Sequence, residues 1–355
     1  MATQVYSTKN PRTNTLAAKE MLARVARCEV SGKFAKNSEM PLNATDNITW
    51  RRLKPFNATA YETPNITPTM LSTPGGSNLL LTEATNPTDY TVDYTDVSAT
   101  MLNYGVLFSF SSKVQLLHED DVPGDMVDLA GDTLGEAMEL VRIGAMISAS
   151  ANVRLASLAA SETAINKKIS PQDLRSAARV LASRRARKHT EILAPSVNIK
   201  TEPIEAAYIV LIHTDAIPDI RDLTGFVHIS EYGQRKVVSE YEVGSWEEFR
   251  FVAIPVMTIN IDTGAAGASG LVPALIGSGT GKVDVYNSIV LAKEAFGHVM
   301  LRGRTALKPT LLPATTVNHG NPMGLKGYVG ANVWYAAKAL NENWMVKIRH
   351  GVTVQ

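Results

Sequence analysis

The chain has 355 residues, of which 45% are hydrophobic and 19% are charged. Its 35 Lys and Arg residues nearly balance its 34 Asp and Glu residues, so the formal net charge is +1. This composition excludes global disorder and a protein that wraps nucleic acid by bulk charge, and the length suggests roughly two domains. The only cysteine, Cys28, excludes an intramolecular disulfide framework and any metal site built from several thiolates.

The N-terminal sequence gives no sign of export. Residues 1–15 lack an apolar signal core, and apolar runs such as residues 206–212 are far shorter than the roughly 20 residues of a membrane span. We therefore expect a soluble protein of a reducing cytosol. Four Asn-x-Ser/Thr triplets lie in Thr-rich sequence without an export signal, so they do not indicate a glycoprotein. They begin at Asn43, Asn47, Asn57 and Asn65.

The first 100 residues contain two segments that cannot form a core of their own. Residues 1–44 hold one amphipathic helical pattern, Leu16 to Arg27, and are predicted to be an arm. Residues 45–100 are rich in Thr, with strand patterns at Ile48–Phe56 and around residues 90–95, and a turn at residues 74–76. This pattern predicts a long protruding hairpin, which needs another surface to lie on because isolated two-stranded ribbons are marginal in water.

A strand region and a long helix follow. Residues 101–117 indicate a strand pair or one long strand. Pro123 and the acidic residues around it predict the start of an amphipathic helix that runs to about Leu155, roughly 50 Å. Beyond Arg142 the polar face disappears, so we expect the second half of this helix to be covered on both sides.

The second half of the chain alternates helix and strand patterns. Ser170 predicts the cap of a basic helix from Pro171 to about His189. A buried strand at Ala206–His213 leads to a short helix capped by Thr214 or Asp215. Further strands are expected at 249–261 and 283–292, with a small-residue loop at 263–282 between them, and a closing hairpin is expected at 333–349.

Motifs for chemistry are weak. The sequence GSGTGK at residues 277–282 resembles a phosphate loop, but Ile276 and Val283 stand where the motif requires Gly and Ser or Thr, so a surface loop is favoured. Cys28 has no nearby His to activate it. The densest group of possible metal ligands is better explained by a helix cap at Asp215 and by ion pairs of Asp219 or Asp222 with Arg221 or another basic group. That group is His213, Asp215, Asp219, Asp222 and His228.

The strongest local charge patch is basic. Two interpretations stay open. The patch is either a solvated or salt-bridged face, with the acidic start of the long helix as its counterpart, or it makes non-specific contact with nucleic acid or an acidic neighbour. The patch consists of Arg175, Arg179, Arg184, Arg185, Arg187, Lys188 and His189. We predict no catalytic, cofactor-binding or metal-binding residues.

Three blocks carry a resemblance to a known family: AAYIVLIHTDAIPDIRDLTGF at 206–226, VDVYNSIVLAKEAFG at 283–297 and NPMGLKGYVGANVWYAAKALNENWMVKIRHG at 321–351. They resemble the major capsid proteins of the short-tailed coliphage N-four and its relatives. The order of elements is similar to the Hong Kong 97 type of capsid protein of tailed bacteriophages.

This resemblance implies an α+β fold of four parts. They are an N-terminal arm (1–44), an extended β-hairpin loop (45–100), a peripheral domain (101–200 and 320–355) with a spine helix near 123–155, and an axial domain (201–319).

The resemblance also implies a function. The protein would assemble into pentamers and hexamers of an icosahedral head around double-stranded DNA, as a virion protein made in the bacterial cytoplasm. Expected partners are a separate scaffolding protein, a portal, possible decoration proteins, and packaged DNA held by loose non-specific contact. The alternatives are a metal-dependent hydrolase using His213 and Asp215, or another phage structural protein of the tail or decoration type.

Overall fold

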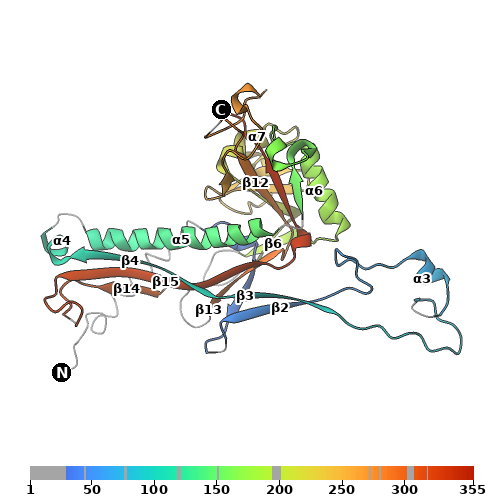
Figure 1. Ribbon diagram of the computed structural model, residues 1–355, viewed down its shortest axis with the longest axis horizontal. Coiled ribbons are helices and arrows are strands. Elements are labelled where there is room, and N and C mark those ends of the chain that lie inside the picture. The colour runs from blue at the N-terminus through green and yellow to red at the C-terminus, as the bar shows by residue number, and fades with distance from the viewer. Residues whose placement is uncertain are drawn as a thin grey trace.

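The computed structural model describes residues 29–43, 45–75, 78–117, 121–149, 152–193, 201–271, 273–279, 281–301, 308–317 and 319–355. The predicted helix Leu16–Arg27 lies outside these residues. Figure 1 shows an elongated layer, a compact body standing over one end of it, and a loop that extends away from both. Within the described residues, no helix combines the length and apolar character needed to cross a membrane.

The elongated layer is a five-stranded sheet covered by one long helix. Its strand order is β1, β13, β15 and β14, and β4 also pairs with β15. The central strand β15 pairs antiparallel with β4 from Lys326–Ser111 to Tyr335–Leu102. The helix α5 packs on the face that carries Val329, Val333 and Tyr335. The strands are β1 (Lys36–Met40), β4 (Leu102–Ser111), β13 (Phe296–Leu301), β14 (Lys308–Leu312) and β15 (Lys326–Ala339), with the short helix α4 (Ser112–Leu117) after β4.

The long helix α5 spans Val122–Ser148, with Asp121 as its cap and Pro123 in its first turn. In its second half, Ile143 and Met146 pack into a cluster shared with the body, but Leu140, Gly144 and Ser148 stay exposed, so the expected cover on both sides is only partial. The predicted end near Leu155 is wrong. The helix has 27 residues, about 40 Å, and residues Val153–Leu155 instead form strand β5, because pairing with β16 outweighs helical periodicity there.

The compact body contains a nine-stranded mixed sheet. Its order is β5, β16, β12, β7, β10, β9 and β8, with β11 beside β12 and β6 beside β7. Along β7, Ile209 and Leu211 face one hydrophobic cluster while Tyr208 and Val210 face another. The further strands are β6 (His189–Leu193), β7 (Thr201–Ile212), β8 (Val227–His228), β9 (Glu242–Trp246), β10 (Phe249–Ala253), β11 (Ile259–Asn260), β12 (Val285–Leu291) and β16 (Met345–His350).

Two helices of the body follow the predicted pattern with corrected ends. Helix α6 spans Pro171–Ser183 and begins with the expected capping box of Ser170 and Asp173. It ends six residues before His189, where β6 begins. The short helix α7 (Ile217–Arg221) follows a 3-10 turn that is capped by His213, not by Thr214 or Asp215.

The predicted closing hairpin at 333–349 is wrong. Strand β15 belongs to the elongated sheet and β16 to the body, and a turn at Glu342–Trp344 carries the chain between them. Both strands show a strand pattern, but alternation alone does not say which partner a strand will take. In β16 nearly every residue is buried because it lies between β12 and β5.

The two sheets also draw on the chain differently from the predicted domain ranges. Strands β13 and β14, within 201–319, lie in the elongated sheet. Strands β5 and β6, within 101–200, and β16, within 320–355, lie in the body. The chain therefore crosses between the elongated layer and the body more often than the predicted domain ranges imply.

The hairpin predicted at 45–100 is a two-stranded ribbon that continues into a longer loop. Strands β2 (Asn47–Leu53) and β3 (Tyr94–Thr100) pair antiparallel in a sheet of their own. Strand β2 ends three residues before the predicted Phe56, and β3 starts later than predicted and runs on to Thr100. The chain between them holds the one-turn helix α3 (Pro68–Ser72). Figure 1 shows this loop extending beyond the body.

Candidate functional site

The extended loop, residues 54–93, presents an unusual amount of apolar surface. Helix α3 buries none of its residues. A hollow of about 670 Å³ lies near the ribbon and is lined by residues 53–60, Glu62 and residues 90–93. Exposed apolar patches of this kind mark interaction surfaces in folded proteins. The exposed large apolar side chains of the loop are Tyr61, Ile66, Leu71, Leu79, Leu80, Leu81, Tyr90 and Val92.

Local contacts nevertheless give the loop a defined path. The rings of Phe56 and Tyr90 meet edge to face with centroids 4.4 Å apart. At the far end, the backbone N–H groups of Leu79 and Leu80 both donate to the Met70 carbonyl, at 2.9 and 3.2 Å. The loop is therefore shaped by its own turns, while its apolar side chains stay in solvent.

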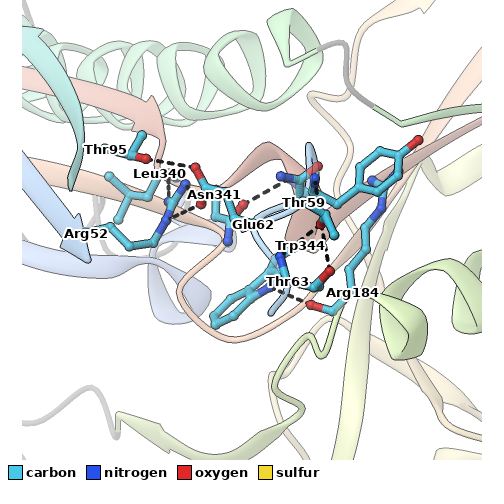
Figure 2. A network of polar contacts seen from close by, with 11 residues as sticks. Arg52, Thr59, Glu62, Thr63, Thr95, Arg184, Leu340, Asn341 and Trp344 are labelled. Atoms are coloured by element: carbon cyan, nitrogen blue, oxygen red, sulfur yellow. Dashed lines mark hydrogen bonds and ion pairs between the residues drawn. The ribbon is translucent and has the colours of Figure 1, made fainter. Parts of the chain in front are cut away.

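Arg52 ties the base of the loop to the rest of the protein (Figure 2). Its Nη1 donates to the Leu340 carbonyl at 2.6 Å, and its Nε donates to Glu62 Oε2 at 2.7 Å. The Thr95 hydroxyl donates to the other Glu62 oxygen at 2.8 Å. One carboxylate thus joins both sides of the loop base, and Arg52 fixes that base to the end of β15.

A second contact joins the loop to the body. The guanidinium of Arg184 lies 4.3 Å from the ring centroid of Tyr61, and the Arg184 carbonyl accepts a hydrogen bond from Trp344 Nε1 at 3.3 Å. Leu340 lies just before the turn Glu342–Trp344 between β15 and β16, and Trp344 is the last residue of that turn. The loop is therefore fastened where the elongated layer meets the body, and we call Arg52, Glu62, Tyr61 and Arg184 the loop anchor.

Two residues of the basic patch predicted around α6 form ion pairs with the body. Arg175 Nη2 lies 2.5 Å from Glu247, and Lys188 Nζ lies 3.1 Å from Glu248. The expected counterpart was the acidic start of α5, and this is wrong, because Figure 1 places that end of α5 at the opposite end of the elongated layer. The turn between β9 and β10 supplies Glu247 and Glu248 instead.

His189, the last residue of that patch, belongs to the interior. Its ring meets Phe34 edge to face at 6.1 Å, and burial lowers its pKa to about 4. His189 is therefore neutral near pH 7 and adds no charge to the patch.

The possible metal ligands do not converge. Asp219 and Asp222 meet on Lys168 Nζ, at 3.2 and 3.1 Å, and Asp219 also accepts from the Thr353 backbone N–H at 2.9 Å. The ion-pair interpretation therefore holds for both carboxylates, with Lys168 in place of Arg221. Within the described ranges, no group of three or more His, Cys, Asp or Glu residues has the geometry of a metal site.

The two histidines of that group act as local caps. His213 Nδ1 accepts from the Asp215 backbone N–H at 3.1 Å, and the Asp215 carboxylate accepts from the Tyr286 hydroxyl at 2.9 Å. His228 Nδ1 accepts from the Ser230 backbone N–H at 3.2 Å. These contacts stabilise the two turns, and although His213 Nδ1 lies 3.3 Å from Asp215 Oδ2, that nitrogen accepts the Asp215 backbone N–H.

The glycine-rich segment faces acidic groups. Ser278 donates to Asp284, and the Asp262 backbone N–H donates to the same carboxylate at 2.9 Å. Gly279 lies directly against the Asp262 carboxylate. Because carboxylates repel phosphate, the described part of this segment does not form a phosphate cradle.

Comparisons with known structures agree with this architecture. A chain in the head structure of Helicobacter pylori bacteriophage KHP40 matches with a TM-score of 0.54 and 11% identity, covering 91% of this chain and 88% of that chain. The capsid of Ralstonia phage GP4 matches with a TM-score of 0.59 and 8% identity, covering 92% and 89%. The cyanophage Pam1 capsid matches with a TM-score of 0.56 and 10% identity, covering 94% and 93%.

This is the Hong Kong 97 type of capsid-protein fold. No protein-family model matches the chain, and no curated protein matches it. At these identities the likeness is one of fold. The α+β class expected from the sequence is confirmed over most of the chain.

The sequence did not identify the loop anchor. Arg52, Glu62 and Arg184 are ordinary charged residues in their local sequence, and their partners lie far away along the chain. The sequence indicated only that the ribbon needs another surface to lie on, because isolated two-stranded ribbons are marginal in water. That expectation did not identify the residues that hold the loop.

Proposed function

We propose that this protein is the major capsid protein of a tailed bacteriophage, a structural protein without catalytic activity. The extended loop carries this proposal. It is fastened at its base by the loop anchor, projects beyond the body and exposes eight large apolar side chains among its described residues. Such a loop is stable in water only if another molecule covers it, and identical copies in a shell would supply that cover.

The layers give the proposed parts of the subunit. The five-stranded sheet with α5 corresponds to the peripheral domain, and the nine-stranded body to the axial domain near the capsomer centre. Residues 45–100 correspond to the extended loop, and residues 1–44 to the N-terminal arm. Pentamers and hexamers would close an icosahedral head around double-stranded DNA, with a separate scaffolding protein and a portal as partners.

Within the tailed phages, we propose that this protein is related to the capsid proteins of the N-four family. The resemblance lies in residues 206–226, 283–297 and 321–351. These blocks include β7, β12, β15 and β16, which form the centres of both sheets. The near-neutral chain suits a container for DNA, because binding that neutralises many phosphates would hinder packaging and release. The proposed location is therefore the virion, after synthesis in the bacterial cytoplasm.

Electron microscopy of the purified protein, with and without a co-expressed scaffolding protein, tests this function. We expect closed shells or five- and six-fold capsomers. Tubes would indicate a tail protein, and compact single particles under all conditions would contradict a role in assembly.

A matched pair of loop variants sharpens the test. Leu71→Asp together with Leu81→Asp places charge on the exposed apolar loop, and we expect shells to disappear while circular dichroism and the unfolding midpoint stay the same. Glu83→Ala, in the same loop, is the control and should assemble normally. Normal shells from the double Asp variant would show that the loop is not an assembly surface.

A further inference from the structure

A hollow on the body lies between strand β5 and helix α6 and has a volume of about 570 Å³. Strand β5 is an end strand of the nine-stranded sheet, and β16 is its only strand partner among the described residues. The three residues of β5 line one side of the hollow, and one face of α6, which includes Ser176 and Arg179, lines the other. The free edge of a sheet therefore borders a cavity of the size typical of ligand sites.

Two arginines line the hollow on the same face of the sheet. In the parallel register of β5 with β16, Arg154 lies beside Ile348, and Ile348 packs in the cluster that contains the buried face of α6. Residues in register lie on the same face of a sheet, so the Arg154 side chain lies on the α6 face. Arg179 lines the hollow from α6 itself.

The positive charge of these two arginines is not balanced locally. Among the described residues, no hydrogen bond or ion pair joins the side chain of Arg154 or Arg179 to a carboxylate. Arg175, on the same face of α6, differs because it pairs with Glu247. Burial lowers the pKa of the Arg184 guanidinium, and the positive charge of Arg154 lowers it further. The hollow therefore favours an anionic ligand.

The acidic residue that lines the hollow does not neutralise this charge. The Asp173 carboxylate accepts from the backbone N–H groups of Ser157 and Ser170, both at 3.1 Å, and from the Ser170 hydroxyl at 2.6 Å. The bond to Ser157 holds a turn in which Leu158 has a φ of 58° and stays 74% exposed. Positive φ is unfavourable for leucine, so the fold holds an apolar side chain at the edge of the hollow.

The backbone at the free edge of β5 has a defined pattern. The Lys347 N–H donates to the Asn152 carbonyl at 2.8 Å, so the next residue of β5 that bonds to β16 in the parallel ladder is Arg154. Val153 and Leu155 therefore turn their N–H and C=O groups away from β16. An extended peptide can bond to such groups and add a strand to the sheet.

A strand added at this edge would place its side chains in two different environments. Every second side chain would lie on the α6 face, beside Arg154 and Arg179. The others would lie on the opposite face, beside the half-buried side chains of Val153 and Leu155. The matching sequence is one in which acidic and apolar residues alternate.

The lining of the hollow suits a peptide better than a nucleic acid. None of the lining residues is aromatic, so bases would have no ring on which to stack. The N–H and C=O groups at the edge of β5 also match the donors and acceptors of an extended peptide, whereas a phosphodiester backbone has no donors to offer the carbonyls.

This chain has an alternating segment of its own, but that segment is already engaged. Residues 89–93 alternate polar and apolar side chains. The Tyr90 ring meets Phe56 at 4.4 Å, and the Asp93 carbonyl accepts from the Lys54 N–H at 2.9 Å. The expected ligand is therefore a segment of a different protein.

We propose that the hollow between β5 and α6 is a docking site for an extended acidic segment of a second protein, in which carboxylates alternate with apolar side chains. The segment adds a strand to the free edge of β5. Its carboxylates bind Arg154 and Arg179, and its apolar side chains lie beside Val153 and Leu155. The site needs no other copy of this chain, so the proposal does not depend on the proposed shell.

A labelled peptide of sequence Glu-Val-Glu-Val-Glu tests the site by fluorescence anisotropy with the purified chain at low salt. We expect saturable binding that weakens by at least about tenfold in Arg154→Glu with Arg179→Glu. The matched control is Arg185→Glu with Arg187→Glu, which makes the same charge change at exposed positions outside the hollow and should bind normally. Unchanged circular dichroism in both double variants shows that the fold is intact. Equal weakening in both, or no binding to the unaltered chain, overturns the proposal.

Two further peptides test the strand geometry. The peptide Glu-Glu-Glu-Val-Val has the same composition without the alternation and should bind at least about tenfold more weakly, while Lys-Val-Lys-Val-Lys should bind the Arg154→Glu, Arg179→Glu variant instead of the unaltered chain. Bound Glu-Val-Glu-Val-Glu should slow amide exchange at Val153 and Leu155, whose N–H groups turn to the free edge. Equal binding of both acidic peptides, or unchanged exchange at these two amides, would show that only bulk charge is recognised and would overturn the proposal.

Two other occupants are distinguished by the same variants. If single-stranded oligothymidylate binds more tightly than the peptide and loses its binding when Arg154 and Arg179 are reversed, the hollow belongs to nucleic acid. If sedimentation shows that the unaltered chain self-associates and the same reversal abolishes this, the occupant is a second copy. Either result overturns the proposal, whereas a monomeric chain that prefers the alternating peptide supports it.

Discussion

The compact body and the elongated layer use their sheets in different ways. Every residue of β9, β10 and β12 is buried, because the body covers both faces of its sheet with its own side chains. The elongated sheet has α5 on one face only, and Leu107 and Trp334 remain exposed. The body therefore buries its own apolar side chains, whereas the layer and its loop leave apolar side chains exposed, where another molecule can cover them.

This difference predicts where substitutions should act. Changes inside the body, or among the buried residues around Arg142 and His298 where α5 and the elongated sheet meet, should lower the stability of the isolated chain. Changes on the loop and on the outer face of the layer should leave that stability intact and alter association instead. Four experiments, in order of decreasing effect, challenge this division.

The largest effect is expected from Arg142→Leu. The substitution leaves the fully buried Glu139 without its partner, so we expect a loss of about 3 to 5 kcal/mol in unfolding free energy. Urea denaturation followed by circular dichroism measures this loss. Arg154→Leu, on the exposed side of β5, is the control and should have little effect. A small loss at Arg142 would mean that its buried pair with Glu139 does not stabilise the fold.

Acid should lower the free energy of unfolding through His298, which is buried near Arg142. Burial, with the positive charge of Arg142 nearby, lowers the pKa of this histidine from 6.5 to about 4. Between these values the unfolded chain binds a proton that the folded chain does not, so stability falls as the pH falls and the loss is complete below about pH 4. The shift corresponds to about 3 kcal/mol.

Unfolding free energies measured from pH 7 to pH 4 test this prediction. His298→Asn should flatten the profile by most of that amount. His228→Asn, in a turn near the surface, should leave the slope unchanged. Identical slopes in all three proteins would show that His298 titrates normally in the folded chain.

Two glycines compare the interior of the body with the outer face of the layer. A Cβ at Gly244, in the body, would lie 2.3 Å from the Phe226 ring and 2.5 Å from the Val227 carbonyl oxygen. A Cβ at Gly330, in the layer, would meet the side chain of Leu107 at 3.0 Å, and that side chain is exposed and free to shift. We expect Gly244→Ala to cost about 2 to 3 kcal/mol and Gly330→Ala less than about 1 kcal/mol by urea denaturation. Equal costs would contradict the distinction between the regions.

The smallest effect on global stability is expected at the loop anchor. Arg52→Ala removes the hydrogen bonds to Leu340 and Glu62, which should raise amide exchange in residues 54–62 while the thermal midpoint changes little. Arg51→Ala, which removes an exposed ion pair with Asp96 and a contact over the Tyr94 ring but no bond to Glu62 or Leu340, should leave exchange in residues 54–62 unchanged. A fully cooperative loss of structure in Arg52→Ala would show that the loop base belongs to the core.

The elements that the sequence predicted well have local signals. Asp121 and Pro123 mark the start of α5, Ser170 marks the start of α6, and the unbroken apolar run in β7 indicates a strand covered on both faces. These features depend on neighbours in the sequence, so the pattern alone suffices.

The errors concern partners far away along the chain. Nothing local to Val346 or Ile348 says that β16 pairs with β12 and leaves β15. Arg184 contacts Tyr61, and Arg52 contacts Leu340, across separations that periodicity does not encode. Periodicity in the sequence did not predict how the strands are arranged, and the resemblance to the N-four capsid family gave the expected fold. The loop anchor and the buried contacts of Arg142 could be identified only from the structure.

The pairing of β4 with β15 has a consequence for the newly made chain. Ser111 meets Lys326 and Leu102 meets Tyr335, so the central pair of the elongated sheet forms only after the ribosome has translated nearly the whole message. Until then β4 carries an unpaired edge and a row of uncovered apolar side chains. Such late, long-range closure is slow and prone to aggregation, so a chaperone that shelters this strand during synthesis would raise the yield of competent subunits.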